Sequence, residues 1–303
     1  MTHMNFGPYR VELSNINKPL FPEADISKGE LIRYYQTIAA TMLPHLQDRP
    51  ITLHRYPDGI DEEGFYQQEM PDYFPEWIQS RQAARADDDK QSTMQHILCN
   101  NQASLVYLAN QAVITLHGWL ARVPKLHTPD RLVFDLDPSG DNFSDVRQAA
   151  HWVIELMEAI NLCPFVMTTG SRGLHVVSPL RPELDFDAIR NLAKDMAAYL
   201  TRKYPEYLTI EHRKHKRRGR IYLDVMRNAY GQTSVIPYSV RALPGAPIAT
   251  PLELSELGDS KLHPQRWHMK NILRRLAQKD DPWRNIWRHA CSPRKVQKTL
   301  NNF

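Results

Sequence analysis

The segment Arg131-Leu-Val-Phe-Asp-Leu-Asp-Pro-Ser-Gly140 decides which fold the sequence predicts. An apolar run that ends in a Pro-Ser-Gly turn is typical of a buried β-strand. Because successive side chains of a strand point to opposite faces, Asp135 and Asp137 share one face, and Phe134 and Leu136 enter the apolar layer behind it. Two carboxylates this close repel each other unless a cation lies between them. The segment therefore indicates a central strand that carries a metal site.

A third carboxylate, Asp224, lies in a second apolar stretch, where Leu223 and Val225 take the opposite face of the expected strand. Magnesium and manganese ions prefer oxygen ligands of this kind. Three acids on adjacent strands can hold two such ions, which activate a 3′-hydroxyl and stabilise a leaving pyrophosphate. A lone Asp-x-Asp pattern is also typical of a solvated strand end or a turn cap, so the pair alone leaves that alternative open.

Helical and strand patterns alternate on both sides of this segment. The expected helices cover about 27–46, 146–160 and 186–203, and the expected strands cover 131–137, 165–169, 174–178 and 220–226. The first helix begins at the capping box Ser27-Lys-Gly-Glu30. Residues 81–93 are polar and predict a loop, and 103–116 predict an apolar helix or buried segment. The layout indicates an α/β or α+β protein with a central mixed sheet.

Bulk composition excludes several classes of protein. The 303 residues are 42% hydrophobic and 24% charged, which is enough to bury a large core. No run approaches the roughly 20 apolar residues of a membrane span, and the N-terminal residues lack a signal-peptide pattern, so we expect a cytoplasmic protein without a membrane partner. Three widely spaced cysteines indicate no disulfide framework. A net charge of +4 permits a polyanionic partner.

The stretch Thr168-Thr-Gly-Ser-Arg-Gly-Leu-His175 joins two expected strands by a glycine turn. Glycines let the backbone approach a ligand, hydroxyls donate to phosphate oxygens, and Arg172 can bind a phosphate through two hydrogen bonds. These features predict a nucleoside triphosphate site. A plain hairpin with a structural His175 is the alternative. The pattern matches neither the phosphate-binding loop of P-loop proteins nor the dinucleotide fingerprint.

Basic and aromatic residues near these motifs predict contact with nucleic acid. The segment His212-Arg-Lys-His-Lys-Arg-Arg-Gly-Arg220 carries six Lys or Arg residues and favours a nucleic-acid backbone over a merely solvated face. Arg227 and Arg241 can neutralise triphosphate charge. A smaller cationic group is formed by Asn15-Ile-Asn-Lys18 and Lys28, and Gly64-Phe-Tyr66 offers rings for base stacking or for the core.

Taken in order, these motifs resemble the polymerase domain of bacterial ligase D, a member of the archaeo-eukaryotic primase superfamily. The resemblance covers nearly the whole chain. It rests on Asn15-Ile-Asn-Lys-Pro-Leu-Phe-Pro22, Arg55-Tyr-Pro-Asp-Gly59, Gly64-Phe-Tyr-Gln67, Arg131-Leu-Val-Phe-Asp-Leu-Asp-Pro138, Gly173-Leu-His-Val-Val177, Arg227-Asn-Ala-Tyr-Gly-Gln-Thr233 and Pro237-Tyr-Ser-Val-Arg-Ala242.

The resemblance implies one primase-polymerase domain over 1–303, with an RNA-recognition-motif-like sheet packed against a second α/β lobe. Its expected parts are an N-terminal lobe over about 1–125, a catalytic lobe over about 126–245 and a C-terminal helical segment over about 246–303. Three residues depart from the family pattern. Thr169 stands where serine is expected, Arg172 where lysine is common and Tyr230 where arginine is common.

The resemblance also implies a role for each candidate residue. Two Mn²⁺ or Mg²⁺ ions are expected on Asp135, Asp137 and Asp224, which are the catalytic acids. The incoming triphosphate is expected on Thr169, Ser171, Arg172, Gly173, His175, Arg227, Arg241 and His117. A downstream DNA 5′-phosphate is expected on Asn15, Lys18 and Lys28, and bases are expected to stack on Phe65 and Tyr66.

The implied activity is template-directed addition of nucleotides, with ribonucleotides preferred, to a 3′-hydroxyl at short gaps or broken ends during non-homologous end joining. The implied partners are gapped duplex or 3′-overhang DNA, a nucleoside triphosphate, the Ku protein and a DNA ligase. A primase-polymerase and an excision-repair gap filler are the alternative enzymes. A DNA end-binding module without catalysis is the alternative from another class, although the three retained acids argue against it.

Overall fold

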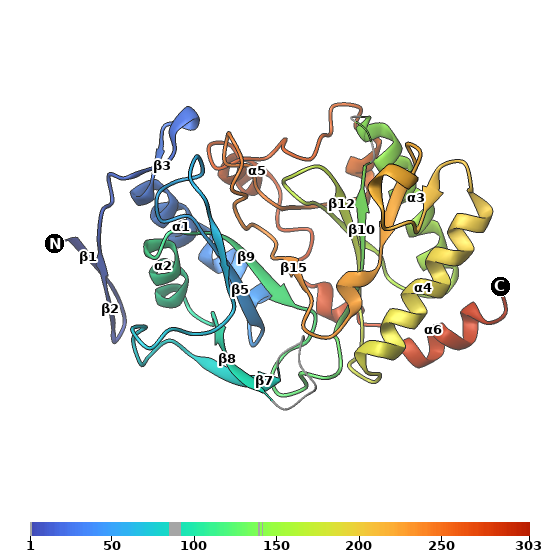
Figure 1. Ribbon diagram of the computed structural model, residues 1–303, viewed down its shortest axis with the longest axis horizontal. Coiled ribbons are helices and arrows are strands. Elements are labelled where there is room, and N and C mark those ends of the chain that lie inside the picture. Colours follow the sequence, from blue (N-terminus) through green and yellow to red (C-terminus); the bar gives the residue numbers. More distant parts are fainter. Residues whose placement is uncertain (1, 85–91, 139, 141) are drawn as a thin grey trace. The chain divides into compact units, whose positions relative to one another are not determined.

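The computed structural model describes residues 2–84, 92–138, 140 and 142–303, which form two compact units. The first unit comprises the residues up to Val123 together with Thr233–Ala249 and Trp267–Asp281. The second unit comprises Pro124–Gln232, Thr250–Arg266 and Pro282–Phe303. Each unit is built around its own sheet, and the ribbon in Figure 1 shows both sheets. The chain therefore passes between the units several times.

The sheet of the first unit is antiparallel and has the order β15-β9-β5-β8-β7, with β6 paired to β5. Its strands are β5 (Pro50–Arg55), β6 (Phe65–Gln67), β7 (Ser80–Ala84), β8 (Thr93–Leu98), β9 (Val113–Trp119) and β15 (Thr233–Val235). Two small hairpins precede them in the chain, formed by β1 (Thr2–Phe6) with β2 (Tyr9–Leu13) and β3 (Pro19–Phe21) with β4 (Ile26–Ser27).

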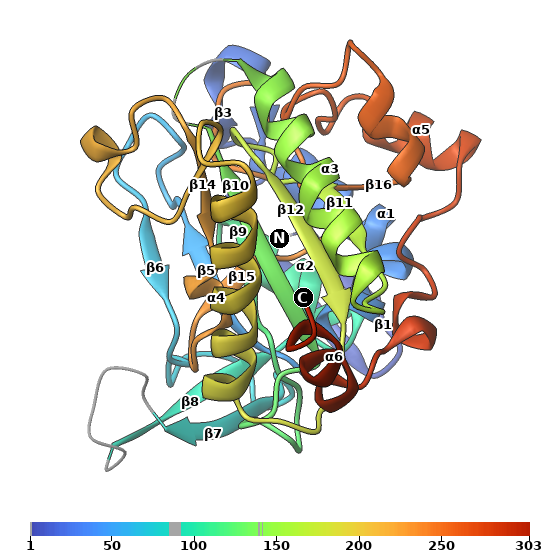
Figure 2. The ribbon, with the colours of Figure 1, turned by 90° about the vertical axis from the view of Figure 1, so that its right-hand side faces the viewer.

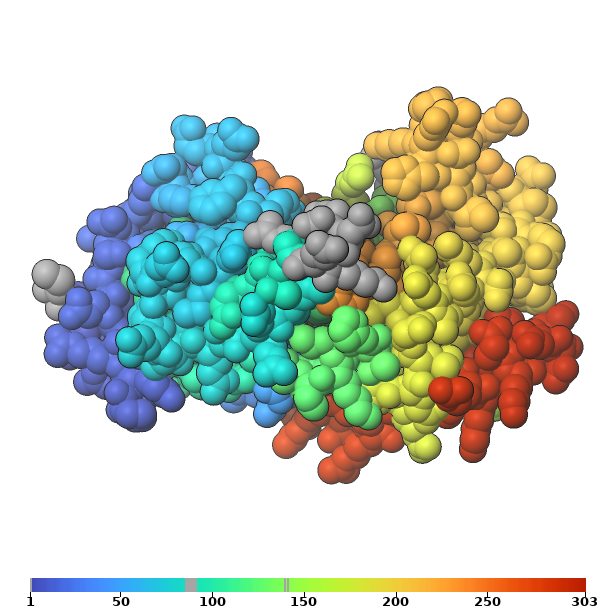
Figure 3. Space-filling view, turned by 60° about the horizontal axis from the view of Figure 1, so that its bottom comes forward, coloured from blue at the N-terminus to red at the C-terminus, as the bar shows by residue number. Residues whose placement is uncertain are grey.

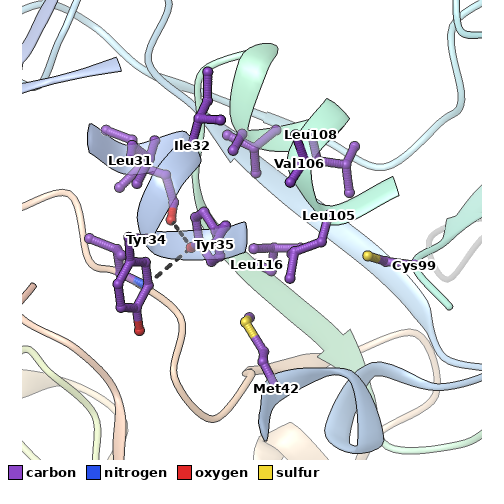
Figure 4. Close-up of a cluster of buried hydrophobic side chains, with 14 of the residues drawn as sticks. Leu31, Ile32, Tyr34, Tyr35, Met42, Cys99, Leu105, Val106, Leu108 and Leu116 are labelled. Carbon is purple, nitrogen blue, oxygen red and sulfur yellow. Dashed lines mark hydrogen bonds between the residues drawn. The ribbon is translucent and has the colours of Figure 1, made fainter. Parts of the chain in front are cut away.

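Three helices belong to the described part of this unit, namely α1 (Lys28–Leu46), α2 (Gln102–Asn110) and α5 (Ile272–Gln278). The predicted start of α1 is confirmed, because Ser27 and Glu30 form a complete capping box. Apolar side chains of α1 and α2 meet in a buried cluster that includes Leu31, Leu105 and Leu116 (Figure 4). Tyr35 lies in this cluster and donates a hydrogen bond of 2.5 Å to the Ile114 carbonyl, which ties α1 to β9.

The sheet of the second unit has the order β13-β14-β10-β12-β11-β16, with β10 in its interior. Its strands are β10 (Arg131–Asp137), β11 (Phe165–Thr168), β12 (Leu174–Pro179), β13 (Leu208–Thr209), β14 (Ile221–Asp224) and β16 (Thr250–Leu252). The chain order β10-α3-β11-β12-α4-β14 gives the spatial order β14-β10-β12-β11, which is the β-α-β-β-α-β arrangement. The predicted α/β class with an RNA-recognition-motif-like sheet is confirmed.

Helices α3 (Phe143–Ala159) and α4 (Phe186–Lys203) cover one face of this sheet, as Figure 2 shows. Their apolar sides face the strands, and the side chains of Asn142 and Asp185 cap their N-termini. A last helix, α6 (Pro293–Leu300), packs against α4. Short 3-10 turns occupy Pro22–Ala24, Lys214–Lys216, Met226–Asn228, Leu254–Gly258 and Ile286–His289. In the described ranges, no helix has both the length and the apolar character that crossing a membrane requires.

Three predicted elements differ from the structure. Residues 103–116 are buried except for the half-buried Gln111, as one predicted alternative stated, but they are not one helix, because α2 ends at Asn110 and Ala112 adopts a left-handed φ of 57° that turns the chain into β9. Residues 81–84 belong to β7 and Thr93 begins β8, so the predicted loop is wrong at both of its ends; 85–91 lie outside the described residues. The strand predicted over 220–226 covers only Ile221–Asp224, because a 3-10 turn begins at Met226.

Candidate active site

Asp135 lies in the middle of a row of polar residues across three neighbouring strands of the second unit. It pairs in register with His175 of β12 on one side and with Asp224 of β14 on the other. Asp137 lies two residues further along β10, on the same face as Asp135, and pairs with Tyr222. The antiparallel order β12-β10-β14 thus brings together acids that are far apart in the sequence, as the pattern of apolar runs predicted.

Two basic side chains surround the carboxylate of Asp135, which is only 5% exposed. His175 Nε2 lies 3.4 Å from Asp135 Oδ1, and the Arg227 guanidinium donates to Oδ2 at 3.3 Å. Burial alone raises the pKa of a carboxyl group, but His175 and Arg227 outweigh that effect and lower the pKa of Asp135 to about 2. Asp135 is therefore ionised at neutral pH and held in one orientation.

Asp137 is in the opposite electrostatic situation. Burial and the negative charges of Asp135 and Asp224 raise its pKa, although the positive charge of Arg172 opposes them. Asp224 accepts a hydrogen bond of 2.8 Å from the Met226 amide, so it also caps the turn that ends β14. The alternative of a solvated strand end or turn cap, which the Asp135 and Asp137 pair left open, does not fit Asp135, because its side chain is buried.

The chemistry of these side chains fits a divalent cation. Their oxygens are the ligand type that Mg²⁺ and Mn²⁺ prefer, and the repulsion that raises the pKa of Asp137 is what a cation relieves. As the side chains stand, no three His, Cys, Asp or Glu residues of the described ranges enclose a common metal position. In this arrangement both Asp135 oxygens are engaged, one by His175 and the other by Arg227.

The turn between β11 and β12 is held by the hydroxyl of Thr169. This oxygen accepts from the amides of Ser171 (3.3 Å) and Gly173 (3.2 Å) and donates to the Gly173 carbonyl at 3.2 Å. Thr169 therefore shapes the turn with contacts inside the turn. Arg172 is exposed at its tip, and its charge acts on Asp137. The predicted triphosphate residues of this turn are thus close to the acids.

Position 173 requires a glycine for a packing reason that the sequence pattern did not reveal. A Cβ atom at this position would lie 2.2 Å from the Leu136 carbonyl oxygen, well inside van der Waals contact. The glycine therefore lets β12 begin directly against the strand that carries Asp135 and Asp137.

Two supporting residues were not among the predicted site residues. Asn228 is fully buried and bonds both backbone groups of Val133, accepting from its amide at 2.9 Å and donating to its carbonyl at 2.8 Å. Asn228 also donates to the Val225 carbonyl, so it fixes the segment with Arg227 against β10. Gln265 donates to the Ser171 carbonyl at 3.0 Å. Asn228 lies within a recognised motif, whereas the region around Gln265 carries no sequence signal.

Arg241 and His117 belong to the first unit, together with a histidine that the sequence analysis overlooked. His117 pairs with Thr52 on β5, and its ring lies edge-on to Tyr66 at 6.0 Å. His54, two residues after Thr52, stacks on Tyr66 and is close enough to Arg241 for that charge to lower its pKa. The candidate nucleotide residues of this unit therefore gather around His54.

Phe65 and Tyr66 do not form one continuous stacking surface. They are successive residues of β6 and so point to opposite faces. Phe65 lies beside Arg55, whose guanidinium is 5.3 Å from the ring centroid, whereas Tyr66 lies on His54. Both rings remain exposed, by 45% and 62%.

The predicted 5′-phosphate residues come together at the start of α1. The Lys28 amide donates to the Lys18 carbonyl, and the Lys18 amide donates to the Asn15 carbonyl. Burial, followed by the charges of Lys18 and Arg55, lowers the pKa of Lys28, which indicates closely spaced cations. Asp58 was not predicted here, and its carboxylate accepts a 2.5 Å hydrogen bond from Lys18 Nζ. An open depression lined by Asn15 and Lys18 adjoins this group.

Part of the basic segment 212–220 has a structural role. The Arg217 guanidinium lies 4.0 Å from the Tyr222 ring centroid and donates to the carbonyls of Glu211 and His212. Most other cations of the segment are exposed, and the space-filling view in Figure 3 draws this stretch in gold on the surface of the second unit. Tyr230, where the family often has arginine, stacks on His127 at 5.1 Å.

Comparison with known proteins gives a consistent result. The family described as "LigD, primase-polymerase domain" matches residues 27–283. The multifunctional non-homologous end joining protein LigD of Mycolicibacterium smegmatis is 31% identical over 275 residues, which cover 90% of this chain and 35% of that protein. The bifunctional non-homologous end joining protein LigD of Bacillus subtilis is 28% identical over 282 residues, 92% of this chain and 44% of that protein. The chain thus spans less than half the length of these two relatives.

A solved structure with a similar fold is the polymerase domain from Mycobacterium tuberculosis Ligase D in complex with DNA. Its TM-score is 0.86 at 29% sequence identity, and the match covers 93% of this chain and 99% of that chain.

Proposed function

Because this chain belongs to the family of the LigD primase-polymerase domain, we propose that it is a metal-dependent nucleotidyltransferase that adds nucleotides to a 3′-hydroxyl at short gaps or broken DNA ends. The observation that carries the proposal is the row His175, Asp135 and Asp224 on adjacent strands, with Asp137 beside it. The names of the relatives support a role in non-homologous end joining. Ku and a DNA ligase are proposed as partners on the resemblance alone.

The acids Asp135, Asp137 and Asp224 are the proposed metal ligands. When bound, two divalent ions, Mn²⁺ or Mg²⁺, supply the positive charge that activates the 3′-hydroxyl and neutralises the departing pyrophosphate. His175 and Arg227 keep Asp135 ionised and oriented before any ligand arrives. These two residues can then turn toward phosphate oxygens when a metal engages the carboxylate.

The triphosphate is proposed to lie over the turn that Thr169 holds together. The Ser171 hydroxyl and the exposed Arg172 guanidinium are the proposed donors to phosphate oxygens there, while the Gly173 amide donates to the Thr169 hydroxyl and shapes the turn beneath them. Arg241 and His117 are proposed as nucleotide contacts on the resemblance alone. We further propose that ribonucleotides are preferred over deoxynucleotides, as the resemblance implies.

DNA is proposed to bind through three groups of residues. Asn15, Lys18 and Lys28 are proposed to form a cationic pocket for a 5′-phosphate at the start of α1, where the charges of Lys18 and Lys28 are close together. Tyr66 and Phe65 are exposed rings for base stacking. The exposed cations of segment 212–220 contact the phosphate backbone, so affinity falls as salt rises.

The decisive experiment is single-nucleotide extension on a gapped duplex that carries a 5′-phosphate, with NTP or dNTP and with Mn²⁺ or Mg²⁺. We expect metal-dependent addition that Asp137→Ala abolishes without unfolding the protein. Tight DNA binding without extension under all four conditions would instead identify an end-binding module. Dinucleotide synthesis on an unprimed template would identify a primase-polymerase.

The 5′-phosphate pocket has its own test. Lys18→Ala is expected to weaken binding to gaps with a 5′-phosphate more than to gaps without one. Asp58→Asn should have the opposite effect, because it releases Lys18 from its ion pair. The exposed Lys194 on α4 gives a matched control, since Lys194→Ala removes one charge outside the pocket. Equal losses on both gaps for Lys18→Ala would remove the pocket from the proposal.

A further inference from the structure

His54 occupies the centre of one face of the first-unit sheet. Across β5 and β6 it pairs directly with Tyr66, and across β5 and β9 it pairs with Thr115. Because side chains alternate along a strand, Thr52 shares the face of His54, and its partner His117 does so as well. The face that carries His54 therefore also carries Tyr66 and His117.

The imidazole of His54 and the phenol ring of Tyr66 are stacked. Their centroids are 4.0 Å apart and their planes differ by 10°, while Tyr56 approaches His54 from another direction at 4.6 Å. Tyr66 is nevertheless 62% exposed, so one side of its ring is covered and much of the rest is open to solvent. An exposed ring backed by a second, parallel ring is a preformed surface for a flat ligand.

The electrostatic surroundings favour an uncharged imidazole. Burial, followed by the charge of Arg241, lowers the pKa of His54 to about 4. At neutral pH the ring therefore lies near Arg241 without repelling it. A lysine or arginine at position 54 would be a second cation in this place and would have no ring to cover Tyr66.

We propose that His54 is a positioning residue, which holds the ring of Tyr66 in a fixed orientation so that it can stack on a base of the bound nucleic acid, on the face that carries His117. The inference deepens the proposed function and rests on its assignment of Tyr66 to base stacking. The physical benefit is entropic, because an exposed tyrosine that is already ordered loses less side-chain freedom when a base binds.

Two substitutions test the contribution of the flat ring of His54 separately from that of its hydrogen-bonding atoms. His54→Phe keeps a flat ring against Tyr66, whereas His54→Gln keeps a polar group and removes the ring. We expect His54→Phe to retain base stacking. We expect His54→Gln to weaken DNA binding roughly two- to tenfold, which is the range for ordering one side chain at an interface.

The primary readout is the fluorescence of 2-aminopurine placed at the gap of a DNA duplex that carries a 5′-phosphate, titrated with the intact protein and without metal or nucleotide. Stacking quenches this base, so the wild type and His54→Phe should quench it equally and His54→Gln should quench it less. Tyr66→Ala gives the amount of quenching that remains when the stacking ring is absent. Tyr207→Ala is the matched control, since Tyr207 is an exposed tyrosine (60%) of the second unit.

A double-mutant cycle tests whether His54 acts through Tyr66. In the Tyr66→Ala background, His54→Gln should cause no further loss of binding or quenching, because the ring that it positions is gone. In extension assays, His54→Gln should raise KM for DNA while changing kcat by less than about twofold, since the lost effect is on binding. Urea unfolding of each variant identifies any loss of DNA binding that comes from misfolding. If His54→Gln misfolds, the comparison of His54→Phe with the wild type decides whether a flat ring at position 54 is sufficient for stacking.

The outcomes distinguish this inference from the proposed function. If the wild type extends primers but His54→Gln quenches and binds like the wild type, the positioning role is wrong and the polymerase remains. If no primer is extended but the quenching pattern holds, the polymerase is wrong and the stacking platform remains. An equal loss for His54→Gln with and without Tyr66 would also overturn the positioning role.

Discussion

Gly173 and Leu136 are in direct backbone contact: a Cβ atom on residue 173 would lie 2.2 Å from the Leu136 carbonyl oxygen. Leu136 lies between Asp135 and Asp137 on β10, so the glycine turn and the strand that carries the acids are fitted to each other at this point. A displacement of the turn would therefore shift the acids and the candidate triphosphate residues together.

Gly173→Ala is expected to lower the free energy of unfolding by about 1–3 kcal/mol, the usual cost of forcing extra atoms into a packed site. The rate of nucleotide addition should fall by more than the loss of folded protein explains, because the displaced Leu136 carbonyl lies between two acids. Urea unfolding and single-nucleotide extension measure the two effects. Gly258→Ala is the matched control, since a Cβ there meets nothing within 4 Å. If both variants behave like the wild type, the contact does not constrain the site.

Asp135→Asn and Asp137→Asn are expected to abolish extension but to change stability in opposite directions. Asp135→Asn leaves His175 and Arg227 without their carboxylate, and the loss of hydrogen bonds to a charged group costs about 1.5–3 kcal/mol. Asp137→Asn removes a charge that Asp135 and Asp224 repel, so thermal stability should rise. Thermal unfolding in the presence of a chelator tests both. Destabilisation by Asp137→Asn would show that the repulsion is already relieved in the metal-free protein.

Divalent metal is expected to stabilise the wild-type protein, because a ligand that binds the folded state raises the free energy of unfolding. Thermal unfolding with Mn²⁺ or Mg²⁺ should therefore show a higher midpoint than unfolding with a chelator. The shift should disappear in Asp137→Asn, which lacks one proposed ligand. A shift of equal size in both proteins would place the bound metal elsewhere.

Asn228→Ala is expected to lower the free energy of unfolding by roughly 2–4 kcal/mol, because the buried amide and carbonyl of Val133 lose their partner. The exposed cap Asn142→Ala should cost about 1 kcal/mol, the usual value for an N-cap. Urea unfolding ranks the two variants. The reverse order would mean that other groups replace the contacts of Asn228.

The titration of His54 should make the free energy of unfolding depend on pH. Its folded pKa of about 4 lies below the ordinary value of about 6.5, so between these values the unfolded chain binds the extra proton. The contribution of His54 to stability is therefore complete above about pH 6.5 and is lost as the pH falls toward 4. His54→Phe should become more stable relative to the wild type as the pH falls. Urea unfolding across this pH range tests the sign, and a constant difference would contradict it.

The central sheet and its acids were predictable because local patterns determine them. The apolar run 131–137 and the alternation of its side chains placed Asp135 and Asp137 on one face before any pairing was known. The register that sets Asp135 against His175 and Asp224 depends on how three distant strands pair, and no local pattern contains that information. The capping box at Ser27 and the full extent of α4 are also local, and both were predicted correctly.

The residues that sequence reasoning missed act through contacts between distant segments. His54 belongs to no motif quoted from the sequence, and only the pairing of β5 with β6 and the nearby charge of Arg241 reveal its environment. Gln265 reaches Ser171 across more than ninety residues of sequence. Asp58 lies in the motif Arg55-Tyr-Pro-Asp-Gly59, but its ion pair with Lys18 depends on tertiary structure. Polar residues in loops carry no periodicity, so their partners cannot be inferred from spacing.

The interleaving of the two units also constrains the order in which the chain can fold. Strand β15 pairs with β9 across the whole intervening stretch Pro124–Gln232, which belongs to the second unit. During synthesis, the strands β10 to β14 are complete before β15 emerges, so the four strands β10, β11, β12 and β14 can pair while the first sheet still lacks β15. A folded insertion holds its two ends at a defined separation, which reduces the entropic cost of the late pairing between Trp119 and Thr233. Substitutions that slow folding of the second unit should therefore also delay completion of the first.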